Sequence, residues 1–116
     1  MRAAVMRGYP KELAELIRQD PGFNVNEVDG IGRTLLHLAS DQNHRSAVIP
    51  LLLAHPDIDV NVKDVYGGTP FFLACWNEST SCVREMLKDS RVKVNEPDNH
   101  GRTPLWHSGT LPPIAT

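Results

Sequence analysis

Apolar residues recur along the chain with two alternating spacings. Three segments carry them at i, i+3 and i+4: Leu13, Leu16 and Ile17; Val48, Leu51 and Leu52; Val83, Met86 and Leu87. This spacing places the apolar side chains on one face of a helix. Three short runs alternate instead: Phe23 and Val25, Ile58 and Val60, Val92 and Val94. Alternation is typical of extended chain, so the pattern predicts helices separated by short extended turns.

The same features return with a period of 34 or 35 residues. The segments TLLHLA, TPFFLA and TPLWHS begin at Thr34, Thr69 and Thr103. A Val-Asn pair recurs at 25–26, 60–61 and 94–95, and an Asp-x-x-Gly sequence begins at Asp29, Asp64 and Asp98. Because all three markers share one period, they indicate an internal repeat.

Each marker predicts a local structure. The threonines are expected to cap the N-termini of helices, with Pro70 and Pro104 at the first helical position. Asp-x-x-Gly is typical of a turn in which glycine adopts a positive φ. The small residues Ala4, Ala39 and Ala74 are expected where neighbouring helices approach closely. Each unit is therefore predicted to consist of a helix, a loop, a second helix and an extended turn.

These residues resemble the ankyrin-repeat family, whose signature is T-P-L-H-x-A. The resemblance implies an all-α solenoid of stacked helix-turn-helix units joined by short β-hairpin-like turns. It implies one domain, 1–116, divided into a partial unit 1–28, full units 29–63 and 64–97, a partial unit 98–110 and an irregular tail 111–116. Only the first full unit keeps the signature histidine, His37, which in the family links neighbouring turns; Phe72 and Trp106 replace it.

Composition and charge narrow the function classes. A chain of 116 residues fits one domain, and a net charge of −2 argues against a general nucleic-acid binder. Two cysteines, Cys75 and Cys82, cannot form a disulfide framework, which favours an intracellular, cytoplasmic location without excluding the nucleus. We expect no membrane span, because no apolar run approaches the necessary length.

Sequence motifs for chemistry are absent. There is no Cys-x-x-Cys, no HExxH, no phosphate-binding glycine loop, and no pair of the five histidines at i, i+4. We therefore expect no enzyme activity, no metal and no cofactor.

The resemblance implies that partner-binding residues lie at the turn tips and first helices, along a concave face. At the turn tips these candidates are Ile31, Arg33, Lys63, Val65, Tyr66, Asn99, His100 and Arg102. On the helices they are Asp41, Gln42, Leu73, Trp76 and Asn77. Tyr66 and Trp76 are the preferred anchors, because aromatic residues dominate binding hot spots. Alternatively, Val28, Ile31 and Val65 pack on neighbouring turns, and Arg33 and Arg102 are solvated charges.

The resemblance also implies possible hydroxylation at Asn26, Asn61 and Asn95, although these side chains could simply stabilise the turns. The expected function is a non-catalytic protein–protein interaction module. Two alternatives are a regulatory or targeting segment of a larger multidomain enzyme or channel, and self-association through the C-terminal unit.

Overall fold

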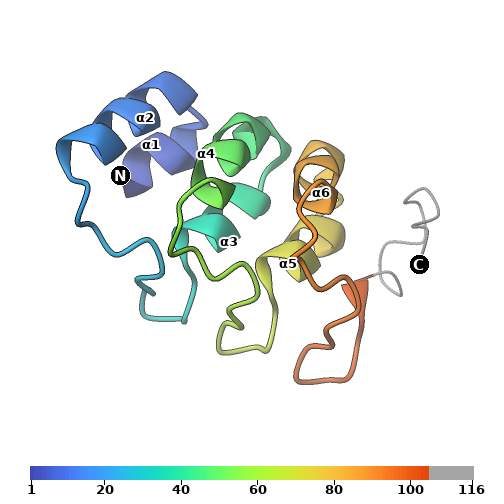
Figure 1. Cartoon of the computed structure of the whole chain (residues 1–116). Coiled ribbons are helices and arrows are strands. Elements are labelled where there is room, and N and C mark those ends of the chain that lie inside the picture. Colours follow the sequence, from blue (N-terminus) through green and yellow to red (C-terminus); the bar gives the residue numbers. More distant parts are fainter. Residues whose placement is uncertain (105–116) are drawn as a thin grey trace.

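The computed structural model describes residues 1–104, which fold into a row of helix pairs (Figure 1). The helices are α1 (Arg2–Arg7), α2 (Pro10–Gln19), α3 (Leu35–Ser40), the 3-10 helix η1 (Asn43–Val48), α4 (Ile49–Leu53), α5 (Pro70–Trp76) and α6 (Thr80–Leu87). No strand occurs within residues 1–104. The predicted all-α stack is confirmed.

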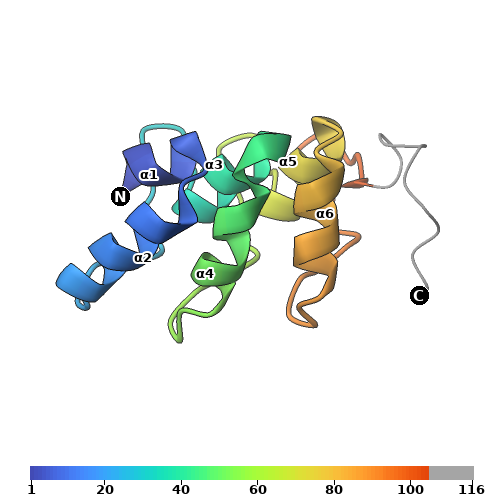
Figure 2. The same ribbon diagram turned by 90° about the horizontal axis from the view of Figure 1, so that it is seen from above.

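The first and second helices of the pairs form two rows. Figure 2 shows α1, α3 and α5 in one row and α2, α4 and α6 in the other. Ala4, Ala39 and Ala74 in the first row are at most 1% exposed. Their small side chains lie where α1, α3 and α5 pack against one another, as the repeat predicts.

Threonine caps start α3 and α5, the first helices of the second and third pairs. The Oγ1 of Thr34 accepts a hydrogen bond from the backbone N of His37 at 3.4 Å, and the Oγ1 of Thr69 accepts one from the backbone N of Phe72 at 3.1 Å. Such caps stabilise a helix by about 1 kcal/mol each. Pro50 lies in the first turn of α4, where a missing N–H is tolerated. The helix expected after Thr103, the position of His107 and the tail 111–116 lie outside the described residues.

The Asp-x-x-Gly turns project from the helices on one side of the molecule (Figure 1). In the second turn, Asp64 Oδ1 accepts hydrogen bonds from the backbone N of Tyr66 and of Gly68, both at 2.9 Å. Gly67 closes this turn with a φ of 81°, a conformation that side chains disfavour. The turns are also bonded to each other, because Val65 N donates to Ile31 O and Asn99 N donates to Tyr66 O, each at 3.0 Å.

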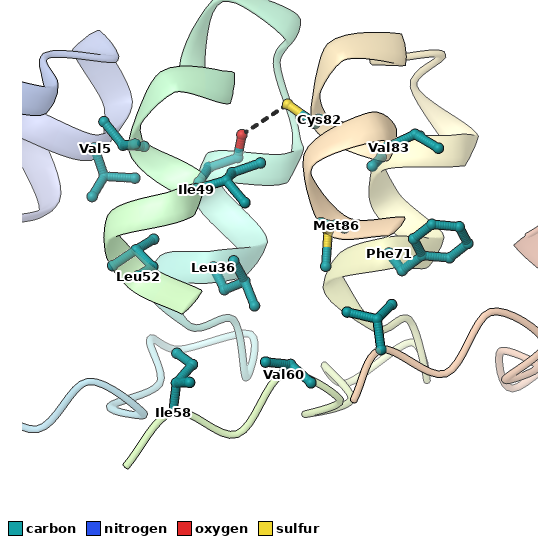
Figure 3. Packing of buried hydrophobic residues seen from close by; sticks show 14 of the residues in the cluster. Val5, Leu36, Ile49, Leu52, Ile58, Val60, Phe71, Cys82, Val83 and Met86 are labelled. Atoms are coloured by element: carbon teal, nitrogen blue, oxygen red, sulfur yellow. Dashed lines mark hydrogen bonds between the residues drawn. The ribbon is translucent and has the colours of Figure 1, made fainter. Parts of the chain in front are cut away.

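The core lies between the two rows of helices and extends to the start of the turns. Leu36, Ile49 and Leu52 are fully buried, and Ile58 and Val60 cover the core from the loop side (Figure 3). Burial of each large side chain contributes about 1.5–3 kcal/mol. The core is shared between units, so each helix pair depends on its neighbours for stability.

Both cysteines belong to this core. The Sγ of Cys82 donates to the carbonyl of Ala39 at 3.4 Å (Figure 3). Burial raises the pKa of Cys75 to about 12 and that of Cys82 to about 11. The two free thiols therefore stay protonated at neutral pH and act as small apolar residues.

Candidate interaction site

Apolar side chains are exposed along the tips of the first and second turns. Val28 is 48% exposed, Ile31 38%, Val65 55% and Tyr66 60%. Val28, Ile31 and Val65 therefore each present part of the side chain to solvent. Their backbones do pack side by side, through the hydrogen bond from Val65 N to Ile31 O. The result is a firmly held row of turns with apolar side chains on its outer edge.

A pocket of about 190 Å³ lies between the second turn, the third turn and α5. Its lining includes six of the predicted binding residues: Arg33, Tyr66, Leu73, Trp76, His100 and Arg102. It also includes Gly68, a turn-tip position in the same register, and three residues that the sequence interpretation missed: Asp64, Phe72 and Asp98. Residues that come from three turns and one helix thus converge on one cavity.

Aromatic rings form one side of this pocket. Phe72 and Trp76 are stacked, with ring centroids 5.7 Å apart and an interplanar angle of 15°. The Cζ of Arg102 lies 4.5 Å from the centre of the Trp76 ring, within the range of a cation–π interaction. Trp76 is half-buried by this packing, whereas Tyr66 reaches farther into solvent. Trp76 is therefore less exposed than Tyr66, although both line the pocket.

The expectation that Leu73 is exposed is wrong, because the side chain is only 7% exposed. Helix α5 is apolar at every position from Pro70 to Cys75, and all six of these residues are buried. A helix that is apolar all round has no face for solvent. Leu73 can contribute only an edge of its side chain to the pocket wall.

Arg33 and Arg102 are not simple solvated charges, since each pairs with a buried carboxylate. The Nε of Arg33 donates to Asp64 Oδ2 at 3.1 Å, bridging the first and second turns. The Nε of Arg102 donates to Asp98 Oδ2 within its own turn at 2.9 Å, and its Nη2 lies 2.7 Å from the same oxygen. Burial alone would raise the pKa of Asp98, but the hydrogen bonds from Arg102 and from the backbone of His100 outweigh it and hold that pKa below its usual value.

The remaining predicted residues lie outside the pocket, and most of them connect neighbouring units. Asn77 Nδ2 donates to Asp41 Oδ1 at 2.6 Å. Lys63 Nζ donates to the carbonyl of Pro97 at 3.1 Å, and Asn99 Nδ2 donates to the carbonyl of Val65 at 3.0 Å. Gln42 is exposed near Asn43. These polar contacts fix the spacing of the turns and helices around the pocket.

His37 makes the link between turns that the resemblance implies. Its Nδ1 accepts from Thr34 N at 3.1 Å, so the ring proton is on Nε2, which donates to the carbonyl of Gly68 at 2.9 Å. Burial lowers the pKa of His37, which keeps the ring neutral at physiological pH. Phe72 stands at the equivalent position of the next unit, and its ring lines the pocket instead.

Asn26 and Asn61 also bridge consecutive units. Asn26 Nδ2 donates to the carbonyl of Asp57, and its Oδ1 accepts from Asp59 N, both at 2.8 Å. Asn61 makes the same pair of bonds one unit later, to the carbonyl of Arg91 and the backbone N of Lys93, each at 2.9 Å. These two asparagines thus have a structural role, and hydroxylation of Asn26, Asn61 or Asn95 stays a prediction.

Residues 1–104 hold neither a candidate metal site nor a helix that could span a membrane. In this part of the chain, no three histidine, cysteine, aspartate or glutamate side chains gather closely enough to hold a metal ion. None of its helices has the length and apolar content that crossing a bilayer requires.

Comparisons with known proteins agree with the repeat architecture. Residues 46–110 match the model of a family described as ankyrin repeats in three copies. Human Rabankyrin-5 is 40% identical over 81 residues, which cover 70% of this chain and 7% of that protein. The bovine SMC5-SMC6 complex localization factor protein 1 is 43% identical over 66 residues, covering 57% of this chain and 6% of that protein.

A third relative covers more of the chain at lower identity. Alpha-latrotoxin-Lg1a from Latrodectus geometricus is 30% identical over 107 residues, which are 91% of this chain and 8% of the toxin. The chain therefore spans less than a tenth of the length of each of these relatives. Since the family model covers more than half of its residues, the chain belongs to the ankyrin-repeat family.

Proposed function

We propose that the chain is a non-catalytic protein-binding module that docks a partner protein on the concave face made by its turn tips and first helices. Ankyrin repeats are protein-interaction modules, and the family is generally non-catalytic. Tyr66 and Trp76 are the proposed anchors. The observation that carries the proposal is the pocket in which these two side chains meet Arg33, His100 and Arg102.

The residue types and their rigidity both support a docking role. Tyrosine, tryptophan and arginine are the residues most enriched among binding hot spots, and Tyr66 is 60% exposed. The second and third turns are held by the hydrogen bonds that Asn99 makes to Val65 and Tyr66. A surface ordered before binding loses little conformational entropy when the partner docks, which favours affinity.

A comparison of two variants tests this function. Tyr66→Ala combined with Trp76→Ala is expected to lose the partner proteins that the wild type retains from an extract of its source organism. Tyr9→Ala is the matched control, because Tyr9 is 53% exposed but does not line the pocket. Quantitative mass spectrometry of the retained proteins is the measurement, with circular dichroism to verify folding. Equal retention by the folded double variant would contradict the proposal.

A regulatory or targeting segment of a larger protein is the second proposed function. The three relatives support it, because each is more than ten times longer than its matched region. Docking would then occur within one polypeptide. An intracellular location is part of both proposals, because two buried thiols that stay free are usual in a reducing compartment.

A further inference from the structure

The pocket opens where the second turn lacks a side chain that its neighbours carry. In register with the repeat, Arg33, Gly68 and Arg102 hold the same position, directly before the capping threonine. Arg33, Gly68 and Arg102 all line the pocket. The gap therefore lies beside a departure from the repeat.

The backbone does not require glycine at position 68. Gly67 has a φ of 81°, and a Cβ there would lie 2.6 Å from the backbone N of Asn99. Gly68 is not among the residues with positive φ. A Cβ added to it would lie 3.5 Å from Asp64 Oδ1 and from Phe72 Cδ1, an ordinary contact distance. The backbone can accept a Cβ at this position, so backbone geometry does not explain the glycine.

The charges around the gap cancel within the pocket. Arg33 pairs with Asp64, and Arg102 pairs with Asp98. The second oxygen of each carboxylate accepts two backbone N–H groups. An incoming ion would have to break one of these ion pairs. An anion that bound the arginine would then lie close to the carboxylate of the same pair, which would repel it. The apolar part of the lining comes from Phe72 and Trp76. Because Phe72 is only 5% exposed and Arg102 lies over the Trp76 ring, the half-buried Trp76 supplies most of this surface, which suits an uncharged group.

We infer that Gly68 determines specificity: the gap it leaves receives one uncharged aliphatic side chain, such as leucine, isoleucine or methionine, from a partner protein. This inference rests on the proposed docking function. The volume of about 190 Å³ suits one inserted side chain, because small-molecule sites are typically larger, about 300–1,000 Å³.

Substitution of Gly68 by arginine fills the gap with the chain's own side chain. Gly68→Arg restores the regular pattern and leaves the Gly68 carbonyl that accepts from His37. Gly22→Arg is the matched control, because it makes the same substitution at a residue outside the pocket, where an added Cβ meets nothing within 4 Å. Gly68→Ala is a milder second variant that removes only part of the gap.

The experiment selects binding peptides from a random twelve-residue library displayed on phage. Selection uses the full wild-type chain, and each selected peptide is then synthesised and its Kd measured for wild type, Gly68→Arg, Gly68→Ala, Gly22→Arg and Tyr66→Ala. We expect the peptides whose binding is weakened by Tyr66→Ala to share an aliphatic residue. Their binding should weaken about tenfold or more with Gly68→Arg, less with Gly68→Ala, and less than about twofold with Gly22→Arg. Melting curves confirm that each variant folds.

Two results would overturn the inference, and they differ in what they imply for the docking function. Peptides that need Tyr66 but bind Gly68→Arg as tightly as wild type, or that share a charged residue instead, would end the inference and leave the docking face in place. The absence of any peptide sensitive to Tyr66→Ala would overturn both.

Discussion

The junction between the first and second turns and the junction between the second and third turns differ in two side chains. At the first junction, His37 reaches the carbonyl of Gly68 and Arg33 reaches Asp64, so one buried and one partly buried side chain cross from the first full unit to the second turn. At the second junction the equivalent residues are Phe72 and Gly68. Neither can form such a bond, and a pocket lies in their place.

This difference shows how a repeat can be adapted without loss of its architecture. The second junction keeps the backbone bond from Asn99 to Tyr66 and adds the bond from Lys63 to the carbonyl of Pro97. Bonds at the edge of the turns hold their spacing, while the space between the turns and α5 holds the pocket. The first junction contributes mainly to stability, and the second provides the proposed site.

The largest effect is expected from removing the bridge at the first junction. His37→Phe makes the first junction resemble the second, and it leaves Thr34 N and the carbonyl of Gly68 without their buried partner. Each such loss costs about 1–3 kcal/mol, so we expect the free energy of unfolding to fall by about 3 kcal/mol. Urea denaturation measures it. His100→Phe, at an exposed histidine, is the control, and an equal loss there would contradict the account.

A smaller loss is expected from the arginine that joins the first two turns. Arg33→Met leaves the side chain of Asp64, which is only 1% exposed, without its cation. We expect a loss of about 2 kcal/mol, below the usual value for a fully buried pair because the Arg33 side chain is 22% exposed. Arg102→Met is the comparison, and its effect should be smaller, because that pair lies within one turn. A larger loss from Arg102→Met would reverse the ranking of the two junctions.

Acid should weaken the first junction through His37. Burial lowers the pKa of this ring from the ordinary value of 6.5, so the unfolded chain binds the proton more readily than the folded chain. The contribution of the neutral ring to stability is complete above about pH 6.5 and declines as the pH falls toward the folded pKa, by at most about 1.4 kcal/mol per pH unit. Denaturation at pH 7, 6 and 5 should show a steeper loss for wild type than for His37→Phe. Parallel pH profiles would contradict this assignment.

The smallest effect on stability is expected at the tip of the second turn. Tyr66→Ala should change the free energy of unfolding by less than about 0.5 kcal/mol, because the side chain is mostly exposed. Thermal unfolding by calorimetry is the measurement. A large loss of stability would show that Tyr66 belongs to the folded core and would remove it as an anchor.

Much of the fold could be predicted because its determinants are local and repeated. The cap at Thr69, the turn at Asp64 and the small Ala39 each follow from residue type and period. The link made by His37 followed from the family resemblance. The family resemblance also implied most of the residues that line the pocket, since it placed binding residues at the turn tips and first helices.

The sequence interpretation failed where three-dimensional neighbours decide the outcome. The burial of Leu73 depends on how α5 packs on every side. Alignment of the repeats gives the position of Leu73 within its unit but not the residues that cover it. The pairing of Arg33 with Asp64 depends on how the first and second turns lie side by side, which residue types alone do not give. A signal for the pocket was present in the departures from the repeat at Gly68 and Phe72, which align with Arg33 and His37.

Site-specific photo-crosslinking tests the docking face most directly. A benzophenone amino acid is placed at position 66 in one chain and at position 9 in another, since both tyrosines are more than half exposed. Each chain is irradiated in an extract of the source organism, and the products are identified by mass spectrometry. The account predicts that position 66 crosslinks to a defined protein and that position 9 does not crosslink to that same protein. The same adduct from both positions, or from position 9 alone, would contradict it.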